Sequence, residues 1–319
     1  MSRPLVSVIC LCYNHARFVR EALESVMVQT YPAVEIIVVD DGSADNSVEV
    51  ISEFILEHPQ IQFIALPQNI GNCAAFNRAL AIAHGAYVVD FATDDVFVAE
   101  RLEKQVALFE SLDDSYGVVF TDVQYIDGES RPFRNHYEYL FSKGLLPYVP
   151  QGEVYAAILR YYFVSSPSML VRRSVLDELG GYDASLAYED FDFWVRSSRI
   201  YKYAFLDERL TLVRRGHRSM STLLYTQGDR QLESTYRICR KAQVLNRTEE
   251  DDKALLWRVR YEFRQAVFSG NYGEAHQFYS LLKELTKPTV ADNTLKFIAT
   301  RRLPLRSLRA IYHLIRFGR

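Results

Sequence analysis

Short apolar runs alternate with helical patterns through the first half of the chain, and this alternation limits the possible folds more than any other feature. The runs of strand length are Leu5–Leu11, Glu35–Val39, Ile61–Leu66 and Tyr87–Phe91. Between them, apolar side chains recur at helical spacing, as from Phe18 to Val26. Strands that are apolar almost throughout are buried on both faces, which is typical of a parallel sheet covered by helices. We therefore predict an α/β fold with a mostly parallel central sheet flanked by helices.

The pattern changes twice further along the chain. Residues 124–164 are rich in Tyr, Phe, Arg and Pro and show no regular period, which is typical of a binding or lid segment. From about residue 223 the pattern is helical, and we expect an antiparallel helix pair that breaks at Gly270–Gly273. We predict an α/β domain at 1–222, with halves at about 1–95 and 96–222, and a helical C-terminal region at 223–319.

Composition excludes several classes of protein. The chain has 319 residues, of which 49% are apolar and 24% charged, and its net charge of −3 gives no overall attraction for nucleic acid. Its four cysteines form no CxxC pair and lie mostly in apolar surroundings, which suits core residues in a reducing compartment. No apolar run approaches the length of a membrane-spanning helix. We expect a cytoplasmic protein.

Two aspartate pairs follow predicted strands. Asp40-Asp41 comes directly after Glu35–Val39, and Asp94-Asp95 comes shortly after Tyr87–Phe91. Open α/β sheets bind their ligands at the carboxyl ends of their strands. Carboxylates gathered there can accept hydrogen bonds from a ribose or a base, or hold a hard cation against phosphates. Each pair could instead serve as a turn that caps the following helix.

The ordered set of motifs resembles the family 2 inverting glycosyltransferases, which have the nucleotide-sugar-binding fold known as GT-A. The motifs that carry the resemblance are Val6–Ile9, Tyr13-Asn14, Val38–Ser43, Asn69-x-Gly71, Asn77, Gly85–Tyr87, Thr93–Asp95, Gly180–Asp183, Glu189-Asp190 and Arg214–Ser221. Each motif alone is weak, and the specific signal is their shared order over residues 4–221. The resemblance implies metal-dependent, inverting transfer of a sugar from a nucleotide diphosphate donor, a UDP-sugar, to a hydroxyl of a glycan or glycolipid in cell-surface polysaccharide biosynthesis.

The resemblance also implies which residues bind the donor. The expected nucleotide contacts are Tyr13, Asn14, Asp40, Asp41, Asn69, Asn77 and Asp94. The expected ligands of Mn²⁺ or Mg²⁺ are Asp95 and His217, and the expected diphosphate contacts are Arg214, Arg215 and Arg218. A cation is needed because two carboxylates would repel a diphosphate beside them. The chain departs from the common family pattern at Ala92, where Asp is usual, so the role of each Asp stays open.

The resemblance makes Asp190 the general base. Glu189, Asp192, Gly181 and Tyr182 are the expected supporting or acceptor-site residues. A single carboxylate would take the proton of the acceptor hydroxyl while that oxygen displaces the diphosphate from the opposite face, which inverts the anomeric centre. Asp192 is a rival for the role of base. An acidic first turn that complements a helix dipole would also explain this cluster without catalysis.

Other functions are less well supported by the motifs. A degenerate, non-catalytic sugar-nucleotide-binding or scaffolding module is suggested by Ala92, although Asp95, Asp190 and His217 are all retained. A nucleotidyltransferase would have a glycine-rich phosphate loop, and the stretch Cys12–Arg17 has no glycine. A dinucleotide-dependent dehydrogenase would have a GxGxxG motif after its first strand, which is missing here.

The end of the chain is strongly basic. Six arginines and no acidic residue lie between Arg301 and Arg319, and the apolar residues beyond Pro304 share one face of a predicted helix. Such a helix could lie on the anionic inner face of the cell membrane, which would make the protein peripheral there. It could equally pack on the domain with its basic face in solvent. The expected partners are the nucleotide-sugar donor and a glycan or lipid-linked acceptor.

Overall fold

The computed structural model describes residues 3–216, 225–228 and 230–303 and divides the chain into two compact units. The first unit consists of Met1–Val154, Phe163–Ser185 and Ile200–His217. The second consists of Tyr155–Tyr162, Leu186–Arg199 and Arg218–Arg319. The C-terminal helical region therefore shares its compact unit with two short segments from earlier in the chain.

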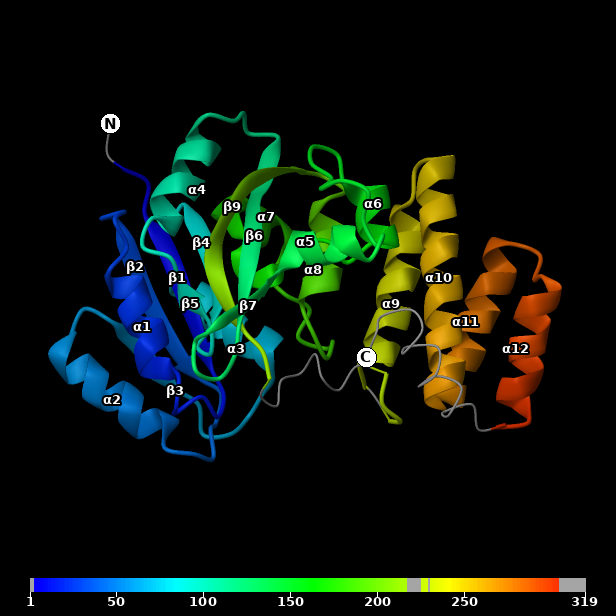
Figure 1. Cartoon of the computed structure of the whole chain (residues 1–319), viewed down its shortest axis with the longest axis horizontal. Helices are drawn as coiled ribbons and strands as arrows, with labels where there is room; N and C mark the ends of the chain where they lie inside the picture. The colour runs from blue at the N-terminus through cyan, green and yellow to red at the C-terminus, as the bar shows by residue number, and fades with distance from the viewer. Residues whose placement is uncertain (1–2, 217–224, 229, 304–319) are drawn as a thin grey trace. The chain divides into compact units, whose positions relative to one another are not determined.

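A single sheet is the centre of the first unit (Figure 1). Its strands are β1 (Val6–Cys12), β2 (Val34–Asp40), β3 (Gln62–Ala65), β4 (Tyr87–Ala92), β5 (Val96–Phe97), β6 (Tyr116–Ile126), β7 (Pro132–Asn135), β8 (Leu170–Arg172) and β9 (Lys202–Arg214). The order is β3-β2-β1-β4-β8-β6-β9-β5, with β7 paired to β6. Strands β1 to β4 are parallel to one another, β6 and β9 are parallel, and β8 is antiparallel to both of its neighbours. The predicted α/β fold with a mostly parallel central sheet is confirmed.

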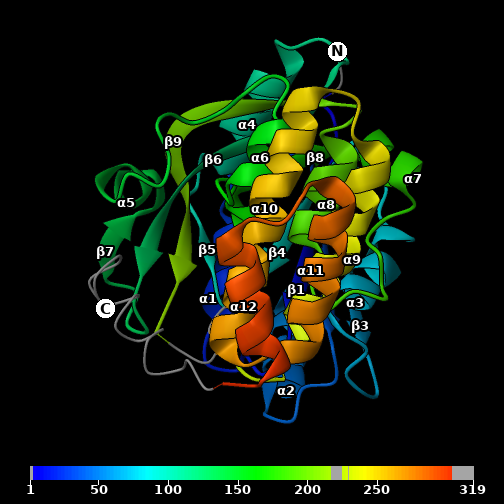
Figure 2. The same ribbon diagram turned by 90° about the vertical axis from the view of Figure 1, so that its right-hand side faces the viewer.

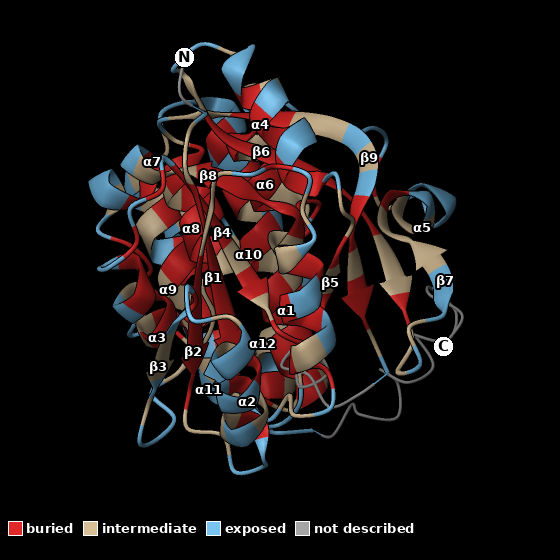
Figure 3. Ribbon diagram, turned by 90° about the vertical axis from the view of Figure 1, so that its left-hand side faces the viewer, coloured by how far each residue is buried: buried red, intermediate tan, exposed pale blue. Residues whose placement is uncertain are grey.

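Helices cover this sheet on both faces because its central strands are apolar on both faces. The helices of the first unit are α1 (Val19–Met27), α2 (Ser47–Glu57), α3 (Asn72–Leu80), α4 (Arg101–Glu110), α5 (His136–Ser142) and α7 (Arg173–Leu179), with a 3₁₀ turn at Ser166–Ser168. Every residue of β1 is buried, and its alternate residues Val6, Val8 and Cys10 share a core cluster with apolar residues of α1, α2 and α4 (Figure 3). Burial of each large aliphatic side chain there contributes about 1.5–3 kcal/mol.

The second unit is helical, as predicted for the C-terminal region. It contains α6 (Tyr155–Arg160), α8 (Asp190–Ser197), α9 (Arg230–Leu245), α10 (Glu249–Ser269), α11 (Tyr272–Leu285) and α12 (Val290–Thr300). Helix α10 ends at Gly270, whose left-handed φ of 80° lets the chain turn back into α11. Helices α10, α11 and α12 lie side by side (Figure 2). Residues 124–164, expected to be irregular, contain β7, α5 and α6.

Two expectations from the sequence concern contact with a membrane. The basic segment from residue 304 onward lies outside the described residues. Within the part of the chain that is described, none of the helices combines the length and the apolar character that a membrane span requires.

Candidate functional site

Both aspartate pairs lie at the carboxyl edge of the sheet, on either side of β1. In the register of the strands, Asp40 at the end of β2 is opposite Cys12, and Ala92 at the end of β4 is opposite Leu11. The loops that follow β1, β2 and β4 therefore meet at one edge, as the sequence predicted for parallel strands.

The Asp40-Asp41 pair organises the loop after β2. Both oxygens of Asp40 accept hydrogen bonds from Ser43, one from its backbone N–H (2.9 Å) and one from its hydroxyl (2.6 Å). The Asp41 carboxylate accepts hydrogen bonds from the backbone N–H groups of Ile70 (2.7 Å) and Gly71 (3.0 Å), which follow β3. Burial raises the pKa of Asp41 above its ordinary value, and those two N–H groups oppose the shift. Asp41 therefore holds the loops after β2 and β3 together.

The loop after β1 is tied to the same place. Asn14, at a φ of 59°, donates its backbone N–H to the Ser43 hydroxyl (2.8 Å) and accepts the N–H of Ala44 through Oδ1 (2.8 Å). The neighbouring Tyr13 side chain is 46% exposed, so its ring is accessible beside the two loops. Asn69 is exposed as well, one residue before Ile70.

Asn77 connects α3 to the Gly180–Tyr182 turn. Its side-chain amide donates to the Tyr182 carbonyl (2.8 Å), and its Oδ1 accepts the Tyr182 N–H (2.9 Å). Gly181 has a φ of 76°, and a Cβ there would lie 2.5 Å from Asn77 Oδ1. These contacts support a structural role for Asn77, and its expected contact with the nucleotide stays a prediction.

The Asp94-Asp95 turn follows β4 and is largely buried. Asp95 accepts the backbone N–H of Arg214 through Oδ1 (2.8 Å). Burial raises the pKa of Asp95 well above its ordinary value, and the nearby negative charge of Asp94 raises it further. The hydrogen bond from the Arg214 N–H lowers the same pKa and so opposes the shift. Two crowded carboxylates with this electrostatic penalty are a donor set that a divalent cation would relieve, so their chemistry fits Mn²⁺ or Mg²⁺.

A histidine that sequence reasoning missed lies beside this turn. The Nδ1 of His15 lies 3.0 Å from the Thr93 hydroxyl, which is also 3.1 Å from the Leu11 carbonyl. The same Nδ1 is 3.9 Å from Asp94 Oδ1. His15 directly follows Tyr13-Asn14 in the sequence, and only the pairing of β1 with β4 shows that it reaches Asp94.

The buried Arg214, at the end of β9, is the centre of a polar network in the first unit. Its guanidinium donates to the Asp94 carbonyl (2.9 Å), the Asp127 carbonyl (2.9 Å) and the Ser130 hydroxyl (3.0 Å), and it pairs with Glu21 (2.7 Å). Only 1% of Arg214 is exposed. These contacts support a positioning role, and the diphosphate contact expected for Arg214 stays a prediction.

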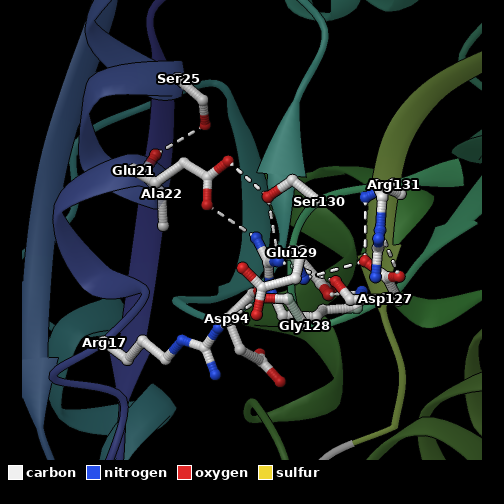
Figure 4. Close-up of polar contacts among 12 residues, drawn as sticks. Arg17, Glu21, Ala22, Ser25, Asp94, Asp127, Gly128, Glu129, Ser130 and Arg131 are labelled. Atoms are coloured by element: carbon white, nitrogen blue, oxygen red, sulfur yellow. Dashed lines mark hydrogen bonds and ion pairs between the residues drawn. The ribbon is translucent and has the colours of Figure 1, made fainter.

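The turn between β6 and β7 is fastened to α1 by further contacts. Ser130 donates to Glu21 (2.9 Å), and Arg17 pairs with Glu129 and donates to the Gly128 carbonyl (2.9 Å), as Figure 4 shows. Three further expected ligands follow Arg214 in the sequence: Arg215 and Arg218 for the diphosphate and His217 for the metal. Arg215 is partly exposed with its guanidinium 5.0 Å from the Tyr125 ring. His217 and Arg218 lie outside the described residues.

The predicted base, Asp190, belongs to the second unit and begins α8. Its Oδ1 accepts the Phe191 N–H (2.6 Å). Burial and the adjacent Glu189 carboxylate raise the pKa of Asp190 to about 7. A carboxylate of that pKa is half ionised at neutral pH and can accept a proton there.

The rival base, Asp192, is in a different environment. It is 1% exposed, and its two oxygens pair with Arg196 Nε (2.7 Å) and Lys241 Nζ (2.6 Å). Two cationic partners occupy both oxygens, which leaves Asp192 poorly placed to take a proton from an acceptor.

Within the described residues, no cluster of three or more His, Cys, Asp or Glu side chains forms a complete metal site. Of the two metal ligands that the sequence predicts, Asp95 lies within the described residues and His217 lies outside them.

Known proteins resemble this chain in sequence and in fold. The family model of glycosyl transferase family 2 matches residues 7–180. An uncharacterized glycosyltransferase of Methanocaldococcus jannaschii is 30% identical over 217 residues, which are 66% of this chain and 70% of that protein. An uncharacterized glycosyltransferase of Rickettsia felis is 25% identical over 300 residues, and the match spans 92% of this chain but 47% of that protein.

Solved structures share the fold at lower identity. TarS of S. aureus in complex with UDP gives a TM-score of 0.69 at 18% identity, covering 99% of this chain and 92% of that one. The mannosyltransferase PcManGT of Pyrobaculum calidifontis, in complex with GDP-Man and Mn²⁺, gives a TM-score of 0.62 at 18% identity, covering 99% and 86%. The predicted family is confirmed by the family model, which matches more than half of the chain: the protein belongs to glycosyl transferase family 2.

Proposed function

We propose that this protein is a metal-dependent inverting glycosyltransferase that moves a sugar from a nucleoside diphosphate to a hydroxyl of a glycan or glycolipid. The observation that carries the proposal is the buried Asp94-Asp95 turn, held at the carboxyl end of β4 beside the Asp40-Asp41 loop. Structural relatives support the donor class, because TarS was solved with UDP and UDP-GlcNAc, and PcManGT with GDP-Man and Mn²⁺.

The donor would bind at the edge of the first unit. The exposed ring of Tyr13 would stack on the base, and the Asp40-Asp41 loop would accept a hydrogen bond from its imide N–H. Asp94 would accept from the ribose, with Asp95 as the ligand of Mn²⁺ or Mg²⁺. The cation would neutralise the charge of the departing diphosphate, and Arg215, Arg218 and His217 are the proposed helpers.

Asp190 would serve as the general base. Its carboxylate takes the hydrogen of the acceptor hydroxyl, the freed oxygen bonds to the anomeric carbon, and the bond from that carbon to the diphosphate breaks. One in-line displacement inverts the configuration of the sugar. The pKa of about 7 at Asp190 supports this assignment. The rival Asp192 is less suitable because both of its oxygens are paired with cationic side chains.

A relative described as a putative teichuronic acid biosynthesis glycosyltransferase, TuaG of Bacillus subtilis, is 36% identical over 104 residues, 33% of this chain and 41% of that protein. It supports a role in cell-surface polysaccharide biosynthesis, which we propose takes place on the cytoplasmic side of the membrane. We extend the proposal to a peripheral contact of the basic segment beyond residue 303 with anionic lipid. Equal pelleting of the full chain and a truncation at Leu303 with anionic liposomes would reject that contact.

Donor hydrolysis tests the main proposal against a scaffolding module. The full chain is incubated with a panel of nucleotide sugars, first with Mn²⁺ and then with excess EDTA. Turnover of one donor that EDTA abolishes is the expected result. Nucleotide binding without metal-dependent turnover of any donor would favour the non-catalytic module.

A further inference from the structure

A basic groove lies in the second unit, outside the proposed donor residues. It has a volume of about 470 Å³ and is formed by α10, the end of α6 and the first turns of α12. Four cationic residues line it, together with an exposed tryptophan and one carboxylate: Arg160, Lys253, Arg260, Arg264, Trp257 and Asp292. A hollow of this size is within the range of ligand-binding pockets in proteins.

The spacing of the residues on α10 produces the groove. Lys253, Trp257, Arg260 and Arg264 follow one another at intervals of three or four, so they form a stripe along one face of the helix. The stripe extends for about 16 Å at a rise of about 1.5 Å per residue. A groove of this length suits an extended chain better than a compact metabolite.

Trp257 provides a rigid apolar surface within the stripe. Trp257 is 41% exposed, and its indole stacks on Tyr261, with ring centroids 5.5 Å apart and an interplanar angle of 8°. An exposed, fixed aromatic face beside hydrogen-bond donors is suited to the apolar face of a sugar ring.

The cationic groups are available to an anionic ligand. Arg264 is exposed and has no ion pair within the described residues. Lys253 and Arg160 pair with Glu249 (2.7 Å) and Glu250 (3.2 Å), whose side chains are both strongly exposed. Exposed pairs of this kind contribute little to stability, so a ligand carboxylate or phosphate can replace them.

One groove residue is oriented by the fold. Asp292 forms a capping box with Thr289 at the start of α12 and also pairs with Arg260 (3.3 Å). Asp292 is buried, so this pair fixes the guanidinium of Arg260 at the wall of the groove. Arg260 is therefore prepositioned.

We propose that this groove binds an anionic glycan, with carboxylate or phosphate groups along its length, as the polymer end of the acceptor or product. This proposal rests on the proposed function, because the glycan would be the acceptor or product of the proposed transfer. A single-stranded nucleic acid is the less favoured ligand, because such sites stack successive bases on several aromatic rings and the whole chain carries a net charge of −3.

Titration of the full-length protein tests the proposal. The probes are an oligogalacturonate, a glycerol-phosphate oligomer, a neutral oligosaccharide of equal length and a single-stranded DNA of equal charge. We expect one of the two anionic glycan-type probes to bind, and which of them binds distinguishes carboxylate from phosphate recognition. Its affinity should fall between 50 and 500 mM salt, about the range over which surface charges become screened. Failure of both to bind, or equal affinity for the neutral probe or for DNA, overturns the proposal.

Three variants locate the binding. Arg264→Glu and Trp257→Ala should each lower the affinity for the probe that binds by roughly tenfold, because each variant loses one charged contact or one stacking face. Lys287→Glu is the matched charge reversal at an exposed residue that does not line the groove. If both groove variants bind as tightly as the parent chain, the proposal is wrong. The exposed Arg264 site keeps the test valid should Trp257→Ala fail to fold.

Donor-side assays separate this inference from the proposed function. Metal-dependent UDP binding and donor hydrolysis should be unchanged in both groove variants. A chain that binds the glycan but turns over no donor would refute the glycosyltransfer, whereas normal turnover with no glycan binding would refute only the groove.

Discussion

Two aspartates two residues apart differ in their suitability as a base, and the difference is set by their partners. Asp190 is next to the negative charge of Glu189, whereas Asp192 is neutralised by Arg196 and Lys241. A base needs a carboxylate oxygen free to accept a proton, and both oxygens of Asp192 are held by cationic partners.

The variant Asp190→Asn should lower transfer by ~10² or more while donor affinity stays within twofold, because the amide cannot accept the proton. In the parent chain, activity should rise with pH through about 7, where Asp190 ionises. The pKa of Asp190 is raised in the fold, so ionisation of its carboxylate destabilises the fold at pH values above the unfolded-state pKa of about 3.9. The variant has no such carboxylate and should be no less stable than the parent chain at pH 8. Initial rates from pH 5 to 9 and urea unfolding check both; retained transfer would move the role to Glu189 or Asp192.

The variant Asp95→Ala should weaken Mn²⁺-dependent donor binding by at least tenfold, because it removes the predicted cation ligand. Without metal, it should raise the free energy of unfolding at neutral pH. The pKa of Asp95 is raised in the fold, so its ionised form is a penalty that grows above pH ~4 and disappears with the side chain. Calorimetry with and without Mn²⁺ measures the first effect, and Asp114→Ala, at a fully exposed side chain, is the control. Unchanged affinity contradicts the assignment.

At the scale of the elements, buried polar contacts join loops that are remote in the sequence. Arg214 links β9 to α1 and to the β6–β7 turn, and its backbone positions Asp95. The variant Arg214→Ala would leave the Asp94 and Asp127 carbonyls without their donor, whereas the 46% exposed Glu21 can be solvated, so we expect a loss of about 1–3 kcal/mol in the free energy of unfolding. Arg131→Ala, at an exposed pair with Asp127, should cost below about 1 kcal/mol. Equal losses in denaturant titrations would show that the network adds little.

Two neighbouring glycines allow the cost of backbone strain to be measured apart from the cost of a steric contact. Gly180 and Gly181 have φ values of 70° and 76°, but only a Cβ on Gly181 meets another atom, Asn77 Oδ1 at 2.5 Å. Both alanine variants carry the strain of a left-handed backbone, about 1 kcal/mol, and Gly181→Ala should cost about 1–3 kcal/mol more because it displaces the Asn77 amide. Thermal unfolding of the two variants gives the difference. Similar values would mean that Asn77 moves aside freely.

Across the whole molecule, the sequence predicts the elements that are set by burial and misses those set by distant partners. The apolar runs identify β1, β2 and β4, whose residues are mostly buried. Strands β5 and β7 are short and exist through pairing with β9 and β6, which no local pattern encodes. Likewise, the ordered motifs indicate Asp95 and Asp190, but the pairing of Glu21 with Arg214 joins residues too far apart in sequence to predict.

The division into two units makes donor binding readable in the unfolding of the whole chain. A ligand that binds only the folded state stabilises it by mass action, about 2.7 kcal/mol at a hundredfold excess over Kd. The proposed nucleotide contacts and Asp95 belong to the first unit, whereas α9 to α12 belong to the second. UDP with Mn²⁺ should therefore raise the melting temperature of the transition that includes the sheet, and EDTA should reverse the shift. Differential scanning calorimetry of the parent chain and Asp95→Ala measures this, and an equal shift in both would place the ligand away from the Asp94-Asp95 turn.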